Sequence, residues 1–125
     1  MKALVTLQMA KNHLRIDTDD ADTEIRQKIQ QAGRAVRNYL KSTKPYMVEL
    51  DSDGEPVLDS NGDIVYFHDS AGSVVVYPEV QQAVLYLLGD MWRDRDGQEK
   101  TDWQLGFLPM PVQSLLYPLR DPALA

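Results

Sequence analysis

Oxygen-bearing side chains alternate at Asp59, Asn61 and Asp63, the spacing with which a calcium-binding loop begins. Alternate ligands of this kind can converge on one cation, and an EF-hand loop completes the set with glycine at its sixth position and a bidentate glutamate at its twelfth. Counted from Asp59, those two positions hold Ile64 and Ser70. We therefore interpret the stretch as a hairpin turn and predict no metal site.

The other residues that could perform chemistry show no arrangement typical of an active site. His13 and His68 are the only histidines, neither has a partner at metal-ligand spacing, and the chain contains no cysteine. Zinc-protease, serine-hydrolase and phosphate-loop motifs are absent as well. We predict no catalytic residue and no cofactor, and we do not expect an enzyme. A small metal-dependent or hydrolytic enzyme is the more distant alternative.

Length and composition predict one ordinary globular domain over residues 1–125. The chain has 125 residues, of which 43% are hydrophobic and 26% are charged. The N-terminal stretch lacks the long apolar core of a signal peptide, so we expect the protein to act where it is made. A net charge of −6 argues against tight nucleic-acid binding, which depends on basic residues that neutralise phosphates.

The charges are distributed unevenly along the chain. Residues 24–44 contain six basic residues and one acid, whereas residues 49–69 contain seven acids and neither lysine nor arginine. Two solvated faces would explain this pattern. Alternatively, the two patches meet, either within the molecule or between copies. One exposed ion pair contributes only about 0–1 kcal/mol, so the contrast matters mainly if it repeats around an assembly or steers encounter.

The elements that position these residues are predicted to be mostly helical. The strongest pattern lies in residues 78–97, where Pro78 suits a first helical turn and apolar residues follow at helical spacing. This spine helix carries Val80, Ala83, Val84, Leu87, Leu88, Met91 and Trp92 on one side. Polar residues interrupt the run too often for a membrane span.

Two helices precede the spine helix, within residues 6–42. Thr6 is a good N-cap for a short helix, and a long amphipathic helix follows with a stripe from Ile25 to Leu40. After residue 97 the C-terminal segment, residues 98–125, contains a short helix that Pro118 ends. The predicted fold class is mainly α: a small bundle of two long amphipathic helices and two short helices, with a central β insertion.

The central region, residues 46–77, contains an internal repeat. LDSDGEPV at residues 50–57 is followed by LDSNGDIV at residues 58–65, and each copy places Asp-Gly or Asn-Gly between short apolar runs. We predict a small antiparallel meander with strands at 46–50, 56–58 and 64–67, and a further extended segment at 73–77. Such a meander is marginal alone and needs support from the helices or from a neighbouring subunit.

Contact residues are predicted from charge and from exposed aromatic side chains. Tyr86 lies off the apolar stripe of the spine helix, and three more aromatic residues follow it in the weakly patterned C-terminal region. The predicted partner or self-assembly interface comprises Arg26, Arg34, Arg37, Lys41, Asp51, Asp53, Asp59, Asp63, Tyr86, Trp103, Phe107 and Tyr117.

Three motifs resemble the phage head-tail connector family, the adaptor proteins of tailed phages and prophages. The first is the Leu-x-x-Ala-Lys-x-x-Leu-Arg-Ile-Asp pattern of residues 7–17, before a long helix with an aromatic residue, Tyr39, near its end. The second is the helix with Pro78, Val80 and Ala83 that ends near Trp92 and Arg95. The third is the closing signature at Leu108, Pro109, Leu115, Leu116, Pro118 and Arg120. The central repeat, residues 47–70, departs from the shorter members.

The resemblance implies a mostly helical structural protein that catalyses nothing. It implies a homo-oligomeric, dodecameric ring beneath the portal protein, at the head-tail junction of the virion, which extends the DNA channel and docks a stopper or tail-completion protein. DNA passes without sequence-specific binding, no membrane is involved, and the subunit waits in the host cytoplasm before assembly. The sequence leaves open whether the free subunit is monomeric. A neck or tail-completion protein on the tail side is the nearer alternative.

Overall fold

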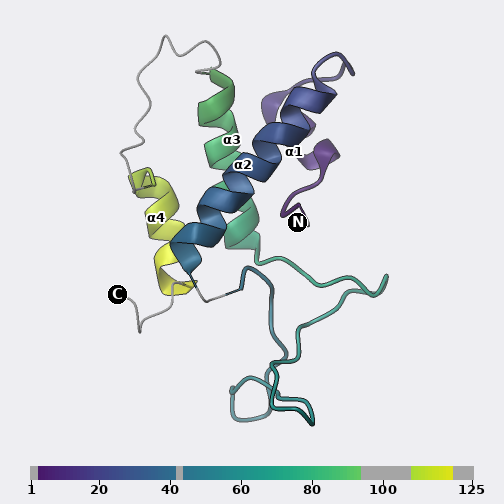
Figure 1. Cartoon of the computed structure of the whole chain (residues 1–125), viewed down its shortest axis with the longest axis vertical. Helices are drawn as coiled ribbons and strands as arrows, with labels where there is room; N and C mark the ends of the chain where they lie inside the picture. The colour runs from purple at the N-terminus through teal and green to yellow at the C-terminus, as the bar shows by residue number, and fades with distance from the viewer. Residues whose placement is uncertain (1–2, 42–43, 94–107, 120–125) are drawn as a thin grey trace. The chain divides into compact units, whose positions relative to one another are not determined.

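A short helix and a long helix open the chain. In the computed structural model, which describes residues 3–41, 44–93 and 108–119, α1 spans Leu7–Leu14 and α2 spans Asp22–Leu40 (Figure 1). Thr6 is the N-cap of α1, as predicted, and its side chain accepts a 3.1 Å hydrogen bond from the backbone N–H of Met9. Asp22 and Glu24 lie in the first turn of α2, where a negative charge interacts favourably with the positive end of the helix dipole.

The second half of the helical structure consists of α3, α4 and a short 3₁₀ turn. Helix α3 spans Pro78–Arg93, α4 spans Met110–Leu116, and η1 spans Tyr117–Leu119. Pro78 begins α3, as the sequence predicted. The last part of the predicted spine helix, residues 94–97, lies outside the described residues.

Helix α3 lies at the centre of the packing and contacts α1, α2 and α4 (Figure 1). Its Leu87 and Leu88 are both fully buried, and so are Ile25 and Val36 of α2 and Leu116 of α4. The predicted stripes of the two long helices therefore form the core, and the mainly helical fold is confirmed. We call this part, Met1–Lys44 together with Pro78–Ala125, the helical unit.

The N-terminal segment packs against α2 at Gly33. A Cβ at this position would lie 3.7 Å from Leu4 Cδ1 and 3.4 Å from Arg37 Nη1. Leu4 is 2% exposed, and its backbone carbonyl accepts a 3.3 Å hydrogen bond from the Gln81 side chain. The segment before α1 is thus held between α2 and α3 by burial and by one polar contact.

The predicted β meander is wrong as a set of extended strands. Residues 45–77 form a second compact unit, which we call the turn unit, and no continuous strand occurs in any part of the chain that the structure describes. The predicted strands at 46–50, 56–58 and 64–67 and the segment at 73–77 make isolated antiparallel bridges instead. These join Tyr46 with Val76, Val48 with Tyr66, Leu50 with Pro56, Leu58 with Ile64, and His68 with Val74.

The bridges stay isolated because three segments at a time share a closed cycle of backbone hydrogen bonds. Val65 accepts from the N–H of Glu49, Val57 accepts from Val65, and Glu49 accepts from Val57, which closes a triangle of backbone hydrogen bonds of 2.9–3.0 Å. A second triangle joins Met47, Phe67 and Val75 in the same way, at 2.7–3.2 Å. Each segment pairs with one neighbour through one residue and then with another neighbour, so no two-stranded ladder can extend.

Three turns of the same design connect these segments. They begin at Asp51, Asp59 and Asp69, and the glycine three residues later has a φ of 81°, 83° and 81° respectively, which favours glycine over other residues. In each turn one carboxylate oxygen of the aspartate accepts backbone N–H bonds, at 2.9 and 3.0 Å, from the residues two and four positions on. The third turn, HDSAGSVV at residues 68–75, is a copy of the repeat that the sequence did not reveal.

Replacement of Asp59 should loosen its turn without disturbing the helical unit. Asp59→Ala removes the acceptor of the Asn61 and Asp63 N–H groups, so we expect amide exchange at those two residues to rise by about tenfold, as the loss of roughly one net hydrogen bond implies. Asp59→Asn keeps an oxygen at the same place and is the matched control. Equal exchange rates in the two variants would show that the carboxylate does not hold the turn.

Candidate assembly surfaces

A stripe of basic residues follows one flank of α2. Arg26, Arg34, Arg37 and Lys41 fall within an arc of roughly 80° on a helix of 3.6 residues per turn, and no acidic residue occurs between Arg26 and Lys41. Arg26, Arg34 and Lys41 are exposed, whereas Arg37 is half-buried beside Gly33. We call these four residues the basic stripe. The structure thus brings together the four basic residues that the sequence singled out.

Lys41 ends α2 in an unusual backbone conformation. Its φ is 60° and its ψ is −119°, and its backbone N–H donates a 3.0 Å hydrogen bond to the carbonyl of Arg37. A positive φ is uncommon for a residue with a side chain, so the chain leaves the helix here at some cost. The basic stripe therefore ends at the point where the helix does.

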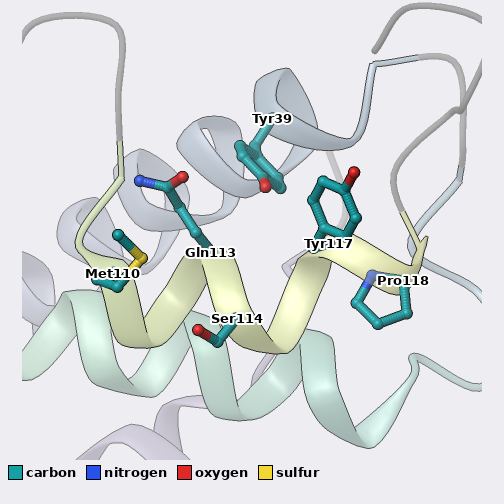
Figure 2. Close-up of a pocket in the computed structure, with 6 residues that line it drawn as sticks. All are labelled: Tyr39, Met110, Gln113, Ser114, Tyr117 and Pro118. Carbon is teal, nitrogen blue, oxygen red and sulfur yellow. The ribbon is translucent and has the colours of Figure 1, made fainter.

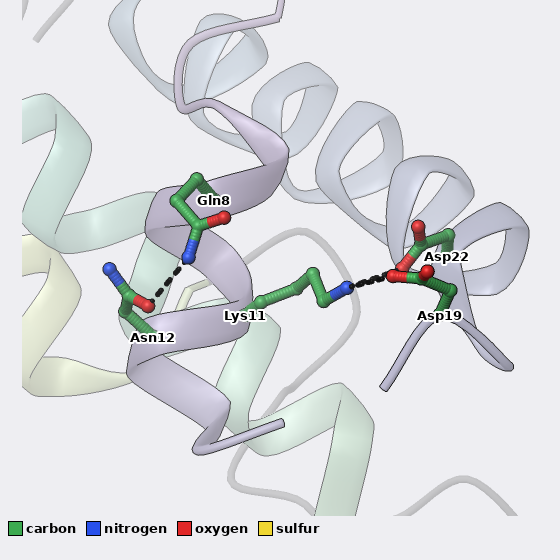
Figure 3. A network of polar contacts seen from close by, with 5 residues as sticks. All are labelled: Gln8, Lys11, Asn12, Asp19 and Asp22. Carbon is green, nitrogen blue, oxygen red and sulfur yellow. Dashed lines mark hydrogen bonds and ion pairs between the residues drawn. The ribbon is translucent and has the colours of Figure 1, made fainter. Parts of the chain in front are cut away.

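Lys11 connects α1 to the start of α2 from a nearly buried position. Its Nζ lies 3.0 Å from a carboxylate oxygen of Asp19 and 3.0 Å from one of Asp22, and only 10% of the side chain is exposed (Figure 3). The hydrogen bond to Asp22, and to a smaller extent the one to Asp19, raises the pKa of Lys11 above its ordinary value of 10.5. Gln8 donates a 2.8 Å hydrogen bond to Asn12 along α1 (Figure 3). The ion pairs of Lys11 are structural, because they join α1 to the segment that begins α2.

Lys11→Met should destabilise the helical unit, and the loss of stability should become smaller at alkaline pH. Because the pKa of Lys11 is raised in the folded state, its contribution is complete below the pKa of the unfolded chain and is lost as the pH rises through the folded pKa. The difference in Tm between wild type and Lys11→Met should be constant from pH 7 to about 10 and shrink above that range. Lys44→Met, at an exposed lysine, is the control; the same pH dependence there would contradict the assignment.

The predicted acidic residues all lie on the surface of the turn unit. Asp51, Asp53, Asp59 and Asp63 are exposed in the first two turns. The Asp51 and Asp59 carboxylates each accept two backbone N–H bonds, while Asp53 and Asp63 supply two of those N–H groups. Two of the four aspartates therefore shape the turns, and all four contribute negative charge to this surface.

Large apolar side chains are also exposed on the turn unit, and sequence reasoning missed them. Leu50 and Leu58 are 59% and 58% exposed, and Ile64 and Phe67 are each 45% exposed. Leu50 bridges Pro56, and Leu58 bridges Ile64, each next to an acidic turn. A signal was present, because a leucine stands directly before the aspartate in both copies of the repeat. We call Leu50, Leu58, Ile64 and the two turns beside them the acidic knob.

A shallow apolar groove of about 400 Å³ lies between α2 and α4. Tyr39 of α2 projects toward Tyr117, and the other lining residues come from α4 and η1 (Figure 2). Those residues are Met110, Gln113, Ser114 and Pro118. Met110 is 71% exposed and Tyr117 is 64% exposed. Tyr117 was predicted as a contact residue, whereas no sequence pattern indicated that Met110 and Tyr39 would lie beside it.

The remaining predicted contact residues are separate from this groove or outside the described part of the chain. Tyr86 is half-buried on α3. Trp103 and Phe107 lie outside the described residues. Among residues 3–41, 44–93 and 108–119 no cluster of three potential metal ligands occurs. Within the same residues, no helix has the length and apolar character that a membrane span requires.

One family model accounts for nearly the whole sequence. The model for the phage gp6-like head-tail connector protein matches residues 4–120. The chain belongs to this family. Comparisons with curated proteins and with solved structures gave no match. The protein is therefore a phage head-tail connector, a structural protein of virion assembly, and the resemblance inferred from its sequence motifs is confirmed.

Several motif residues of this connector are packing residues. Ala10, Val80, Ala83 and Leu116 are fully buried, and Lys11 makes the ion pairs between α1 and the start of α2. The connector motifs thus specify how the helices pack. The basic stripe, the acidic knob and the groove are the surfaces left for contacts with other molecules.

Proposed function

We propose that this connector assembles into a dodecameric ring of identical subunits beneath the portal protein of a tailed phage. The ring extends the DNA channel and docks a stopper or tail-completion protein. One observation carries the proposal, namely the family match over residues 4–120. The whole chain acts as one connector subunit, which waits in the host cytoplasm and joins the virion at the head-tail junction.

The distribution of charge supports assembly into a ring. A closed ring of identical subunits uses heterologous interfaces, in which one surface of each copy meets a different surface of the next. The helical unit carries the basic stripe, in which Arg26, Arg34 and Lys41 are exposed, and the turn unit carries seven acidic residues without lysine or arginine. Opposite charges on different parts of one chain supply two unlike surfaces, which steer the encounter between copies.

The net charge also suits a channel through which DNA must pass. Tight DNA binding requires several lysine or arginine contacts to phosphates. The chain carries a net charge of −6, and the basic stripe is placed by this proposal at the contact between copies. Outside the basic stripe, the 19 acidic residues outnumber the nine remaining lysines and arginines, so the balance of charge still disfavours tight binding to phosphates.

Binding to the portal tests this function. Purified connector is mixed with the portal protein of the same phage, and the mass of the complex is measured by multi-angle light scattering. We expect a complex that contains a full ring, and density for the ring between portal and tail in electron cryo-microscopy of the virion. Density on the tail side, away from the portal, would instead identify a neck or tail-completion protein. No density at the junction would refute the proposal.

Reversal of charge on the basic stripe should weaken association between copies. Arg34→Glu combined with Arg37→Glu replaces two attractions with repulsions, so we expect the apparent Kd of assembly to rise by about tenfold in low salt and by much less in high salt. The matched control is Arg34→Lys with Arg37→Lys, which keeps the charge. If the Glu variant assembled like the wild type and had the same Tm, the basic stripe would be shown not to take part in the interface.

A further inference from the structure

The dipeptide Asn61-Gly62 lies at the tip of the second turn of the turn unit. Asn61 is exposed, and Gly62 has a φ of 83°. Among the described residues, no atom outside the adjoining residues lies within 4 Å of the place that a Cβ on Gly62 would occupy. The backbone nitrogen of Gly62 is therefore not shielded by a side chain from the asparagine that precedes it.

This pair of residues can undergo a reaction within the backbone. The Gly62 nitrogen forms a bond with Cγ of Asn61, gives up its proton and displaces ammonia, which closes a five-membered succinimide ring. Water then adds to one of the two ring carbonyls and opens the ring to aspartate or to isoaspartate. One water is consumed and one ammonia is released, and the reaction requires no oxidant, metal or enzyme. Glycine hinders ring closure least, because it has no Cβ.

One hydrogen bond restrains the attacking nitrogen. The Gly62 N–H donates to the Asp59 carbonyl at 3.0 Å, and the Asp59 carboxylate accepts the N–H groups on either side of it, from Asn61 and Asp63. Hydrogen bonds at an exposed turn open at a smaller cost in free energy than those of a packed helix. The turn therefore slows the reaction without preventing it, and the rate follows the fraction of time for which the turn is open.

We propose that Asn61 is a site of spontaneous deamidation, where aspartate and isoaspartate accumulate as the protein ages. The chain has two other asparagines, and helices protect both. Asn12 lies in α1 and Asn38 lies in α2, so the N–H that follows each of them belongs to a helical hydrogen-bond ladder. Each is also followed by a residue with a large side chain, His13 and Tyr39 respectively.

The two other turns of the turn unit carry different residues at the equivalent place. Asp53 precedes Gly54, and Ala71 precedes Gly72, in turns with the same positive φ at glycine. Alanine has no side-chain carbonyl and cannot form the ring. An ionised carboxylate is a much poorer electrophile than an amide, so Asp53 should form the ring far more slowly than Asn61. One chain thus presents the same turn with a reactive, a slow and an inert residue.

Isoaspartate loosens the second turn, whereas ordinary aspartate adds only one negative charge. In isoaspartate the backbone runs through the former side chain, which inserts one carbon between the Cα of residue 61 and the nitrogen of Gly62. The native turn holds the Asp63 N–H 3.0 Å from the Asp59 carboxylate and the Asp63 carbonyl 2.8 Å from the Asp59 N–H. A longer backbone cannot keep both distances, so these hydrogen bonds weaken.

Peptide mapping of aged protein tests the proposal. The full chain is kept at neutral pH and physiological temperature, samples are digested at intervals, and mass spectrometry follows the conversion of amide to acid at each asparagine. We expect Asn61 to deamidate roughly tenfold faster than Asn12 or Asn38, or more, since exposed turns open more readily than packed helices. Deamidation of Asn61 no faster than that of the two helical asparagines would overturn the proposal.

The number of products tests the cyclic mechanism. Two products should appear at residue 61, one of which coelutes with the corresponding peptide of the Asn61→Asp variant. The other should be the isoaspartate peptide, identified against a synthetic standard. A single product without isoaspartate would mean direct hydrolysis of the side-chain amide and would overturn the step through the succinimide.

Two variants separate the chemistry from the turn. Asn61→Ala copies the residue at the equivalent place of the third turn, so it should keep the turn and remain unmodified on ageing. Asp59→Ala removes the acceptor of the N–H groups on both sides of Gly62, so the deamidation rate should rise about tenfold, as the loss of roughly one net hydrogen bond implies. A rate equal to that of the wild type would overturn the restraint by the turn.

Amide exchange measures the effect on the turn. Aged wild-type protein should exchange faster at Asp63 than aged Asn61→Ala, while the first and third turns exchange equally in both. Equal exchange at Asp63 in a sample that contains isoaspartate would overturn the loosening of the second turn. These measurements need no ring, so they neither support nor refute the proposed function.

Discussion

Leu87→Ala is expected to lower the free energy of unfolding of the helical unit by about 2–5 kcal/mol, the range for a truncated core leucine. Leu87 and its neighbour Leu88 are both completely buried in α3, and α3 contacts the three other helices. Because α3 packs against three other helices, we expect its surroundings to relax little around a cavity at this buried position. Because small proteins are stable by only about 5–15 kcal/mol, a large share of the total would be lost.

The measurement is urea denaturation of the full chain, with the slope m compared between variants. Gln82→Ala on the exposed side of the same helix is the matched control, and it should change the free energy by less than about 0.5 kcal/mol. An unchanged m with a lower midpoint would assign the loss to the native core. If Leu87→Ala cost no more than Gln82→Ala, the central position of α3 would be disproved.

The helical half of the fold could be predicted because its signals are local. A helix satisfies its own backbone hydrogen bonds, so the residues of its buried face recur at a fixed spacing within one stretch of sequence. The residues assigned to the core from Val80 to Leu88 are buried, and so are those from Ile25 to Leu40 apart from Tyr39, whereas Tyr39, Met91 and Trp92 are only half-buried. The cap at Thr6 could be predicted for the same reason, since the acceptor and the Met9 N–H lie within one turn.

The turn unit could not be predicted to the same extent, because its pairing is not local. The Asp-Gly and Asn-Gly signals marked two turns, but the sequence does not state that three segments close into a triangle. The third turn lacked either dipeptide and has Ala71 before Gly72. The feature shared by all three is an aspartate three residues before a glycine of positive φ. Searching for that pair of residues, in place of the dipeptide, would have found the third copy.

Among the candidate surfaces, too, those that depend on local sequence could be predicted and those that depend on packing between distant segments could not. The basic stripe was predictable because charged residues at helical spacing fall on one flank of a helix, although Arg37 is half-buried there. The groove depends on how α4 packs beside α2, which brings Tyr39 near residues more than 70 positions later in the chain. Lys11 was noticed only as a motif residue, and its ion pairs with Asp19 and Asp22 became visible when α1 and α2 were placed together.

Leu116→Ala should selectively release α4 and remove the groove. Helix α4 has only seven residues, Met110–Leu116, and a helix so short is not stable alone in water. It is held by packing against α3, chiefly through Val112 and Leu116, which are both fully buried. Truncation of Leu116 should cost about 2–5 kcal/mol. Because α4 lies at one side of the core, we expect this cost to appear first as local unfolding.

Amide hydrogen exchange measures that local unfolding. Exchange should rise sharply from Val112 to Leu116 while Ile29 to Val36 of α2 and Val84 to Leu88 of α3 stay protected, and assembly on the portal should be lost together with the groove. Ser114→Ala, at an exposed position of the same helix, is the control for stability and should keep the protection of α4. Uniform loss of protection across all helices would mean that α4 is part of one cooperative core. Loss of assembly in the Leu116 variant would then be attributed to global unfolding.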